Sequence, residues 1–249
     1  MAQSETERFT GFAASYNAGR PGYPPQVVDC ILEGLSDPSG LKVADLGAGT
    51  GLSSQLFAQR GATVFAIEPN ASMRAKGASI AGVTWCDGTA EHTGLDDRSV
   101  DVVVAFQAFH WFDYGAALGE MIRVLHPGGR AAVLFYERDE RDPFTRAYGD
   151  VVRRFATDET EARRAHALQT FAQWPGWSRT QRHVIEGEHV LDEAGLAVRL
   201  ESTSYLPHSG PESDALKAAV GELFRKNAKD GRVRLALQTI VVVAEPKAR

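Results

Sequence analysis

The chain has 249 residues, of which 43% are hydrophobic and 24% are charged, and its formal net charge is −5. This composition excludes a disordered or fibrous chain, and the length allows one large domain or two small ones. The acidic balance argues against a nucleic-acid partner, and the two cysteines, Cys30 and Cys86, cannot supply a disulfide framework or a Cys-based zinc site.

The N-terminus and the longest apolar run indicate where the protein is found. Residues 1–5 are polar and lack the apolar core of a signal peptide. The run 239–244 is too short to cross a bilayer. We therefore expect a cytoplasmic protein with no membrane partner, and the sequence carries no signal for its oligomeric state.

The first half of the chain alternates short apolar strands with amphipathic helices. A helix is expected after the turn-rich residues 20–25, with its apolar face at Val27, Val28, Ile31, Leu32 and Leu35. Further helices are expected at 53–59, 71–78 and 114–125. The expected strands are 41–46, 63–67, 83–86, 100–106 and 130–136. This alternation predicts a parallel sheet that helices cover on both faces.

After Glu137 the alternation breaks. An amphipathic helix is expected near 144–155, and residues 157–190 are expected to be irregular. The alternation returns with a strand near 197–205, a helix near 212–227 and a final strand near 233–244. We interpret 138–190 as an insertion or lid after the fifth strand, and not as a separate domain.

A glycine-rich turn between a strand and a helix is the clearest motif. The turn runs Asp45-Leu46-Gly47-Ala48-Gly49-Thr50-Gly51. Its glycines let a ligand approach the backbone, and the start of the next helix offers free N–H groups. Glu68 ends the following strand, where a carboxylate can accept both hydroxyls of a ribose. These features together predict a nucleoside-binding site.

Two kinds of nucleoside fit such a site. A dinucleotide site has the pattern G-x-G-x-x-G, whereas this turn has G-x-G-x-G and places Leu52 where the third glycine would stand. Asp45 suits a cationic ligand, because it attracts a sulfonium or amino group and repels a diphosphate. A nucleotide-dependent oxidoreductase is therefore the second hypothesis. A non-catalytic partner subunit that keeps the cofactor fold is the third.

The motifs resemble those of class I S-adenosylmethionine-dependent methyltransferases. Residues 45–51 resemble motif I, 68–70 the acidic ribose-binding strand end, 88–91 the adenine-side loop and 123–129 the turn before strand five. The resemblance implies a Rossmann-like, seven-stranded, mostly parallel α/β sheet and S-adenosyl-L-methionine as cofactor. It implies one methyltransferase domain, divided into an N-terminal cap (1–38), a cofactor-binding core (39–137), a lid (138–190) and a C-terminal part that completes the sheet (191–249).

Within this class the chain is similar to the branch of trans-aconitate methyltransferase-like proteins. The similarity lies in residues 16–24 and 107–112. It implies a small-molecule substrate that accepts the methyl group on a carboxylate or a hydroxyl. Residues 106–109 are Phe-Gln-Ala-Phe, where amide and adenine N-methyltransferases often carry an Asn-Pro-Pro-Tyr-like run, so a nucleic-acid substrate is not expected.

The resemblance also implies roles for individual residues. Gly47, Ala48 and Gly49 are expected to contact the methionine part of the cofactor, with Asp45 and Gly51 in the same motif. Glu68 is expected to hold the ribose, with Pro69 beside the adenine. Thr89, Ala90 and Glu91 are expected to border the adenine. The family often has Asp where this chain has Thr89, so Thr89, Glu91 and Asp87 all remain candidates for the bond to the adenine amino group.

The mouth of the site is expected at Gln107 and the residues after it. His110 is the candidate catalytic residue, as a general base or as a group that orients the substrate, and its alternative is packing between Phe109 and Trp111. Trp111 is expected on the substrate side. Three residues of the cap, Tyr16, Arg20 and Tyr23, are expected to cover the cofactor.

Several other polar and aromatic groups have two readings. Trp174 and Trp177 wall a substrate pocket or anchor the lid. Arg153-Arg154 and Arg163-Arg164 bind a carboxylate substrate or form a solvated helix face. His183 and His189 lie beside Glu186 and Glu188, but their spacing matches no helical pair of metal ligands, so no metal is predicted.

Overall fold

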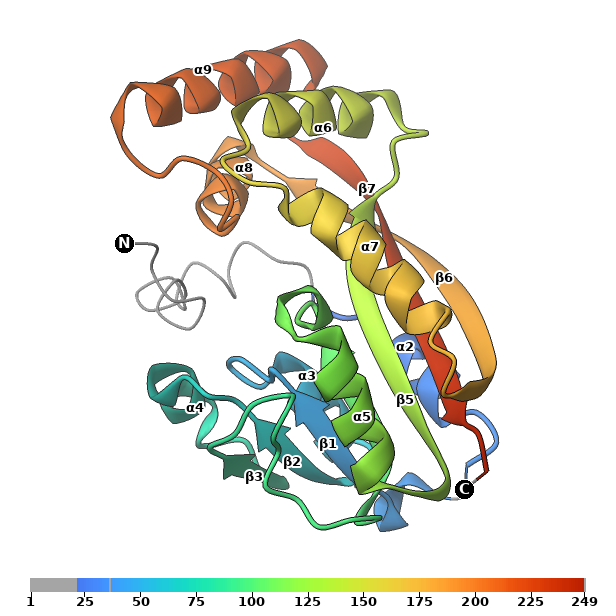
Figure 1. Cartoon of the computed structure of the whole chain (residues 1–249). Coiled ribbons are helices and arrows are strands. Elements are labelled where there is room, and N and C mark those ends of the chain that lie inside the picture. Colours follow the sequence, from blue (N-terminus) through green and yellow to red (C-terminus); the bar gives the residue numbers. More distant parts are fainter. Residues whose placement is uncertain (1–21, 36, 249) are drawn as a thin grey trace.

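The structure of the chain is a computed structural model that describes residues 22–35 and 37–248 (Figure 1). The predictions for Tyr16 and Arg20 lie outside the described residues. The helix that follows them in sequence, α2 (Gln26–Leu32), is present where the apolar face predicts it, and a 3₁₀ turn at Pro38–Gly40 leads into the first strand.

Seven strands form one sheet in the order β3-β2-β1-β4-β5-β7-β6. The first five strands run parallel: β1 (Lys42–Leu46), β2 (Thr63–Ile67), β3 (Val83–Cys86), β4 (Val100–Phe106) and β5 (Leu125–Arg138). The strand β7 (Val233–Pro246) runs antiparallel between β5 and β6 (Trp177–Leu191). The predicted seven-stranded, mostly parallel sheet is thus confirmed.

Helices cover both faces of this sheet, because successive residues of its strands point to opposite sides. Val43, for example, packs with α2 and with Phe57 of α3 (Leu52–Ala58). Its neighbour Ala44 packs in a second cluster, on the side of α5 (Tyr114–Val124) and α7 (Thr160–Ala172). Figure 1 shows α5 and α7, in green and yellow, on the same side of the strands. The short helix α4 (Ala71–Gly77) follows β2.

Three further helices form a separate group at the far end of the long strands β5, β6 and β7 (Figure 1). They are α6 (Pro143–Phe155), α8 (Glu193–Glu201) and α9 (Gly210–Asn227). Their apolar faces share a third core cluster with the ends of β6 and β7, which includes Tyr148, Val152, Leu196, Leu200, Leu216, Val220, Phe224 and Leu235. This group lies beyond the carboxyl end of β5 and borders the space above the parallel strands.

Two predictions for the second half of the chain are wrong. Residues 157–190, expected to be irregular, contain α7 and the edge strand β6. Residues 197–205, expected to form a strand, lie in α8 and the turn after it. Leu196 and Leu200 are both buried four residues apart, which is the helical period, and Asp192 caps this helix by accepting a hydrogen bond from the Gly195 amide at 2.7 Å.

The strand β5 is also longer than expected. It begins at Leu125 and therefore includes the His126–Gly129 turn, which we expected to separate a helix from the strand. The division of the chain into a cap, a core and a lid stays a prediction. The edge strand β6 lies in the segment expected to be the lid, except for its last residue, Leu191.

Candidate functional site

A cavity of about 280 Å³ opens at the carboxyl ends of the parallel strands. In the sheet, β1 lies between β2 and β4. The chain continues from β1 to β2 on one side and from β4 to β5 on the other, so the strand order reverses between β1 and β4. Ligands of such sheets bind where the strand order reverses. The cavity brings together nine predicted site residues: Gly47, Gly49, Glu68, Pro69, Thr89, Ala90, Glu91, Gln107 and Trp111. The predicted residues Asp45, Ala48, Gly51, Tyr23 and His110 are not part of its wall.

The glycines of the turn serve two different purposes. Gly47 and Gly51 have φ angles of 67° and 87°, and a Cβ atom at either would approach a neighbouring side chain to 2.7 and 2.6 Å respectively. These two positions therefore need glycine for backbone geometry and packing. Gly49 has φ 59°, but a Cβ there would meet nothing within 4 Å. The open space at Gly49 belongs to the cavity, where a ligand can approach the backbone.

Asp45 lies beneath the glycine turn and is fully buried. Its Oδ2 accepts hydrogen bonds from the hydroxyls of Ser53 and Ser54, each at 2.6 Å, while its Oδ1 has no hydrogen-bond partner. Burial raises the pKa of Asp45 to about 6, against the opposing effect of the two serine hydroxyls. The Asp45 carboxylate thus joins β1 to the first turn of α3. Asp45 therefore supports the glycine-rich turn and does not line the cavity itself.

Glu68 directly follows the last residue of β2 and is held by two backbone amides. Its Oε2 accepts from the Gly49 N–H and its Oε1 accepts from the Asn70 N–H, each at 2.9 Å. Each oxygen keeps a lone pair for another donor, because a carboxylate has about four acceptor positions. The side chain is 8% exposed and lines the cavity. A preoriented carboxylate therefore stands in the wall of the cavity with acceptor positions left for a ligand.

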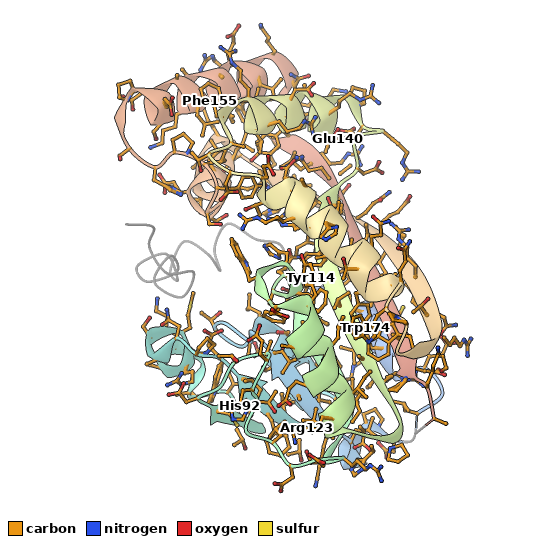
Figure 2. All side chains as sticks on the ribbon, in the orientation of Figure 1. His92, Tyr114, Arg123, Glu140, Phe155 and Trp174 are labelled. Atoms are coloured by element: carbon orange, nitrogen blue, oxygen red, sulfur yellow. The ribbon has the colours of Figure 1, made fainter. Side chains whose placement is uncertain are left out.

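The loop after β3 forms the far wall of the cavity. Thr89 Oγ1 accepts from the backbone N–H of His92 at 3.2 Å, and Glu91 Oε1 accepts from the Asp113 N–H at 3.0 Å. Asp87 is not part of the wall, because its carboxylate lies 3.0 Å from the Arg74 guanidinium in an ion pair and is 74% exposed. Of the three candidates for the adenine contact, the structure therefore places Thr89 and Glu91 at the cavity. His92, which donates to Thr89, marks this loop in Figure 2.

Gln107 follows β4 and occupies a special position. Its φ angle is 57°, which non-glycine residues rarely adopt, and its N–H donates to the Leu134 carbonyl at 2.8 Å. The side chain is 7% exposed, and its Nε2 is buried without a hydrogen-bond partner. A left-handed backbone and an unpaired amide at one residue are typical of a functional position.

The residues after Gln107 form a 3₁₀ turn at Phe109–Trp111. This turn directs the His110 ring toward the core, where its centroid lies 5.4 Å from that of Phe135 and 4.6 Å from that of Trp111. The role of His110 in catalysis stays a prediction, and the structure places it behind the wall. Trp111 lines the cavity, and the Arg163 guanidinium lies 4.8 Å above its ring.

Several other candidates lie elsewhere. The ring of Tyr23 stacks on Tyr136 and contacts the edge of Phe106, with centroids 5.2 and 5.1 Å apart. Trp174 and Trp177 do not line the cavity, and the Trp177 Nε1 donates to the Phe171 carbonyl of α7 at 2.8 Å. Within residues 22–35 and 37–248, no three His, Cys, Asp or Glu side chains gather as a metal site, and no helix is long and apolar enough to cross a membrane.

A second, smaller cavity was not predicted from the sequence. It measures about 70 Å³ and lies between the carboxyl end of β5 and the helices α6, α7 and α8. Gln107 lines both cavities. The only sequence signal for this cavity is the Arg163-Arg164 pair, since Arg164 lines it. Arg153 instead pairs with Glu140 and Asp150 on the surface, and Arg154 is exposed.

Comparisons with known proteins agree on one family. The family model of a methyltransferase domain matches residues 44–133. An uncharacterized methyltransferase of Mycobacterium tuberculosis is 35% identical over 79% of this chain and 76% of its own length. Demethylmenaquinone methyltransferase of Thermobifida fusca is 30% identical over 82% of this chain and 84% of its own length. The fold is similar to that of a SAM-dependent methyltransferase from Geobacter sulfurreducens in complex with S-adenosyl-L-homocysteine, with a TM-score of 0.55 and 17% identity over 97% of this chain and 98% of that one.

Proposed function

Because the chain belongs to the methyltransferase family, we propose that it transfers the methyl group of S-adenosylmethionine to a small molecule. The observation that carries this proposal is the Glu68 carboxylate, which two backbone amides hold in the wall of the cavity. Membership of this family also argues against the nucleotide-dependent oxidoreductase. The narrower likeness to trans-aconitate methyltransferase-like proteins stays a prediction.

The residues of the cavity fit the parts of S-adenosylmethionine. The free acceptor positions of Glu68 suit the two ribose hydroxyls, and Pro69 lies next to it in the wall. Thr89 and Glu91 supply polar groups on the side assigned to the adenine. The open space at Gly49 admits the methionine part close to the backbone. Asp45 supports this turn from below and keeps its two serine hydrogen bonds.

S-adenosylmethionine supplies a methyl group that a sulfonium already activates, so the protein's task is to align the acceptor and exclude water. Phe106, Ala108 and Phe112 give the cavity apolar walls beside Gln107. They keep water from the reacting atoms, and the fixed backbone of Gln107 holds its amide at the junction with the second cavity. The acceptor is expected to meet the methyl group at this junction.

The acceptor is proposed to be a small molecule that receives the methyl group on a carboxylate or a hydroxyl. A carboxylate needs no base at neutral pH, whereas a hydroxyl needs one. The name of the Thermobifida fusca relative indicates a small-molecule acceptor for that protein, which supports the same class here. The formal charge of −5 gives no support for a nucleic-acid partner.

Calorimetry tests the cofactor directly. The full chain is titrated with S-adenosylhomocysteine and, separately, with NAD. We expect saturable binding of S-adenosylhomocysteine and none of NAD at the same concentrations. Binding of NAD alone would overturn the proposal. Binding of S-adenosylhomocysteine without transfer of a labelled methyl group to any molecule in a cell extract would instead favour the non-catalytic subunit.

A further inference from the structure

The strand β6 forms the outer edge of the sheet on the side of β7. It has 15 residues, and among the described residues it pairs with β7 alone. Figure 1 shows β6, in orange, beside β7 and away from the parallel strands. Alternate backbone N–H and C=O groups of an edge strand point away from the sheet, so a further strand can pair with them.

One face of this strand carries the exposed apolar side chains of the molecule. Within residues 22–35 and 37–248, the exposed large hydrophobic side chains are Val184 and Val190, which are 41% and 46% exposed. They lie on the same face of β6, because side chains two or six residues apart point to the same side. Ile185 points to the opposite face and packs in the cluster that contains α2. One face of β6 is thus covered by the protein itself, and the other is open.

The charges on the open face are placed symmetrically about Val184. Arg182 lies two residues before it and Glu186 two residues after it, and both are exposed. If a second copy of β6 pairs antiparallel about a two-fold axis through Val184, each residue lies opposite the one equally far on the other side of Val184. Arg182 of each copy then lies opposite Glu186 of the other. The two Val184 side chains lie side by side.

Other alignments of the two strands lack this match. An axis through Arg182 or through Glu186 places that residue opposite its own copy, and like charges directly opposite are destabilising. An axis through Ile185 pairs Arg182 with Glu188 but sets Val184 against Glu186. The alignment on Val184 therefore combines opposite charges with contact between the exposed valines. Cross-strand pairs of these two kinds are those that stabilise a sheet.

The ions on β6 are available for such pairs. No carboxylate lies within 4.0 Å of the Arg182 guanidinium among the described residues. Glu186 contacts Arg141 at 2.6 Å, and the two side chains are 71% and 68% exposed. Arg141 also donates to both oxygens of Asp139, at 2.8 and 2.6 Å. Glu186 can therefore accept from a second arginine while Arg141 keeps its pairing with Asp139.

We propose that β6 is the interface between two copies of this chain, which pair antiparallel about a two-fold axis through Val184 and join their sheets into one. Two Arg182–Glu186 ion pairs form between the copies, and Val184 of each covers Val184 of the other. The assembly closes at two chains, because a two-fold axis uses the same surface of each copy. This inference concerns the outer edge of the sheet and does not depend on the proposed function.

Analytical ultracentrifugation of the full chain over a series of concentrations tests the interface. We expect a species with twice the mass of one chain. Arg182→Glu sets like charges opposite each other at two places and should raise the dissociation constant of the dimer at least tenfold. The double variant Arg182→Glu/Glu186→Arg restores opposite charges and should return within threefold of the unchanged chain. Arg154→Glu, the same change at an exposed position of α6, should have no effect.

Cross-linking tests the alignment of the two strands. The axis through Val184 places its two Cβ atoms about 5 Å apart, so Val184→Cys should be joined to its own copy by a short bis-maleimide. Val190→Cys is the matched control, because Val190 is as exposed but lies opposite Ser178 of the second copy. It should not cross-link above background. The unchanged chain, in which Cys30 and Cys86 are half-buried, gives that background.

Three results would overturn the proposal. They are a monomer throughout the concentration series, a dimer that Arg182→Glu does not weaken or the double variant does not restore, and cross-linking of Val190→Cys as readily as of Val184→Cys. An unchanged far-ultraviolet circular dichroism spectrum verifies that each variant is folded. Arg182→Gln removes the charge without reversing it, should weaken the dimer less than Arg182→Glu, and replaces that variant in the test if it does not fold.

Discussion

The larger cavity and a cluster near the C-terminal end of α5 each hold a buried glutamate, Glu68 and Glu120, in different states. The Arg123 cluster consists of Thr93, Asp97, Glu120 and Arg123. Arg123 donates to Glu120 at 2.7 and 2.8 Å, to Asp97 at 2.6 Å and to the Leu95 carbonyl at 2.7 Å. Glu120 also accepts from the N–H and hydroxyl of Thr93 at 2.8 and 2.6 Å. In the larger cavity, Glu68 accepts from two backbone amides only, and Gln107 Nε2 is buried without a hydrogen bond.

The position of each cluster explains this difference. Figure 2 labels Arg123 near one end of α5 and Tyr114 at the other, which faces the carboxyl ends of the strands. A charge network whose members satisfy one another contributes to stability and leaves nothing for a ligand. Unsatisfied buried groups cost stability and are retained where a ligand completes them. Pairing, and not the number of charges, therefore distinguishes a structural cluster from a binding site.

The largest expected effect is on the affinity of the larger cavity for its cofactor. Glu68→Ala removes the carboxylate that faces the cavity, and the loss of a charge-assisted bond to the ribose should cost about 1.5–3 kcal/mol, roughly ten- to hundredfold in affinity. Calorimetry with S-adenosylhomocysteine measures it. Glu222→Ala, at an exposed position of α9, is the matched control and should bind normally. An unchanged dissociation constant in Glu68→Ala would disprove the role of Glu68.

Asp45 lies between the two cases, because one of its oxygens is paired and the other is not. Burial raises its pKa from 3.8 to about 6. The folded protein therefore holds this proton more tightly than the unfolded chain does, so stability should fall as pH rises from about 4 to 6, by about 3 kcal/mol. Asp45→Asn should lack this fall. The difference in unfolding free energy between the two proteins, measured by urea at several pH values, checks it, and a constant difference would refute the assignment.

The Arg123 cluster should respond in stability alone. Glu120→Gln removes the charge that pairs with Arg123 and should lower the free energy of unfolding by about 2 kcal/mol at pH 7. Arg123 lowers the pKa of Glu120 from 4.5 to about 2. This contribution is therefore fully present above about pH 4.5 and is lost as pH falls toward 2. Urea unfolding measures the change. A loss of affinity for S-adenosylhomocysteine in this variant would contradict a purely structural role of the Arg123 cluster.

The smallest expected effect concerns the adenine side. Thr89→Ala removes a hydroxyl that already accepts from the His92 N–H at 3.2 Å. The expected loss is about 0.5 kcal/mol, or two- to threefold in affinity for S-adenosylhomocysteine. Glu91→Gln is measured beside it. A tenfold loss in Thr89→Ala with no change in Glu91→Gln would assign the adenine contact to Thr89, and the opposite pattern would assign it to Glu91.

The first half of the fold could be predicted because its signals are local. The strands 63–67, 83–86 and 100–106 occur at the predicted residues. A buried parallel strand is a continuous apolar run, and the glycine turn with Glu68 is a short motif, so a single sequence contains both. The nine site residues at the cavity come from four such strand ends, which a parallel sheet brings together by its topology.

The second half could not be predicted because its signals are not local. The edge strand β6 has only β7 as a neighbour and carries charges on both faces, so it lacks the apolar run of a central strand. The second cavity joins Gln107, Arg164 and Arg199 from distant parts of the chain, and no spacing in the sequence indicates this contact. At His110, the strand end was located correctly, but the turn that points its ring to Phe135 has no local signature.

Methyl transfer from labelled S-adenosylmethionine tests the central claim most directly. The full chain is incubated with the labelled cofactor and a cell extract, and the label is measured in the small-molecule, protein and nucleic-acid fractions. We expect label in the small-molecule fraction, with much less label for Glu68→Ala than for the unchanged chain. Label found only in protein or nucleic acid would contradict this claim.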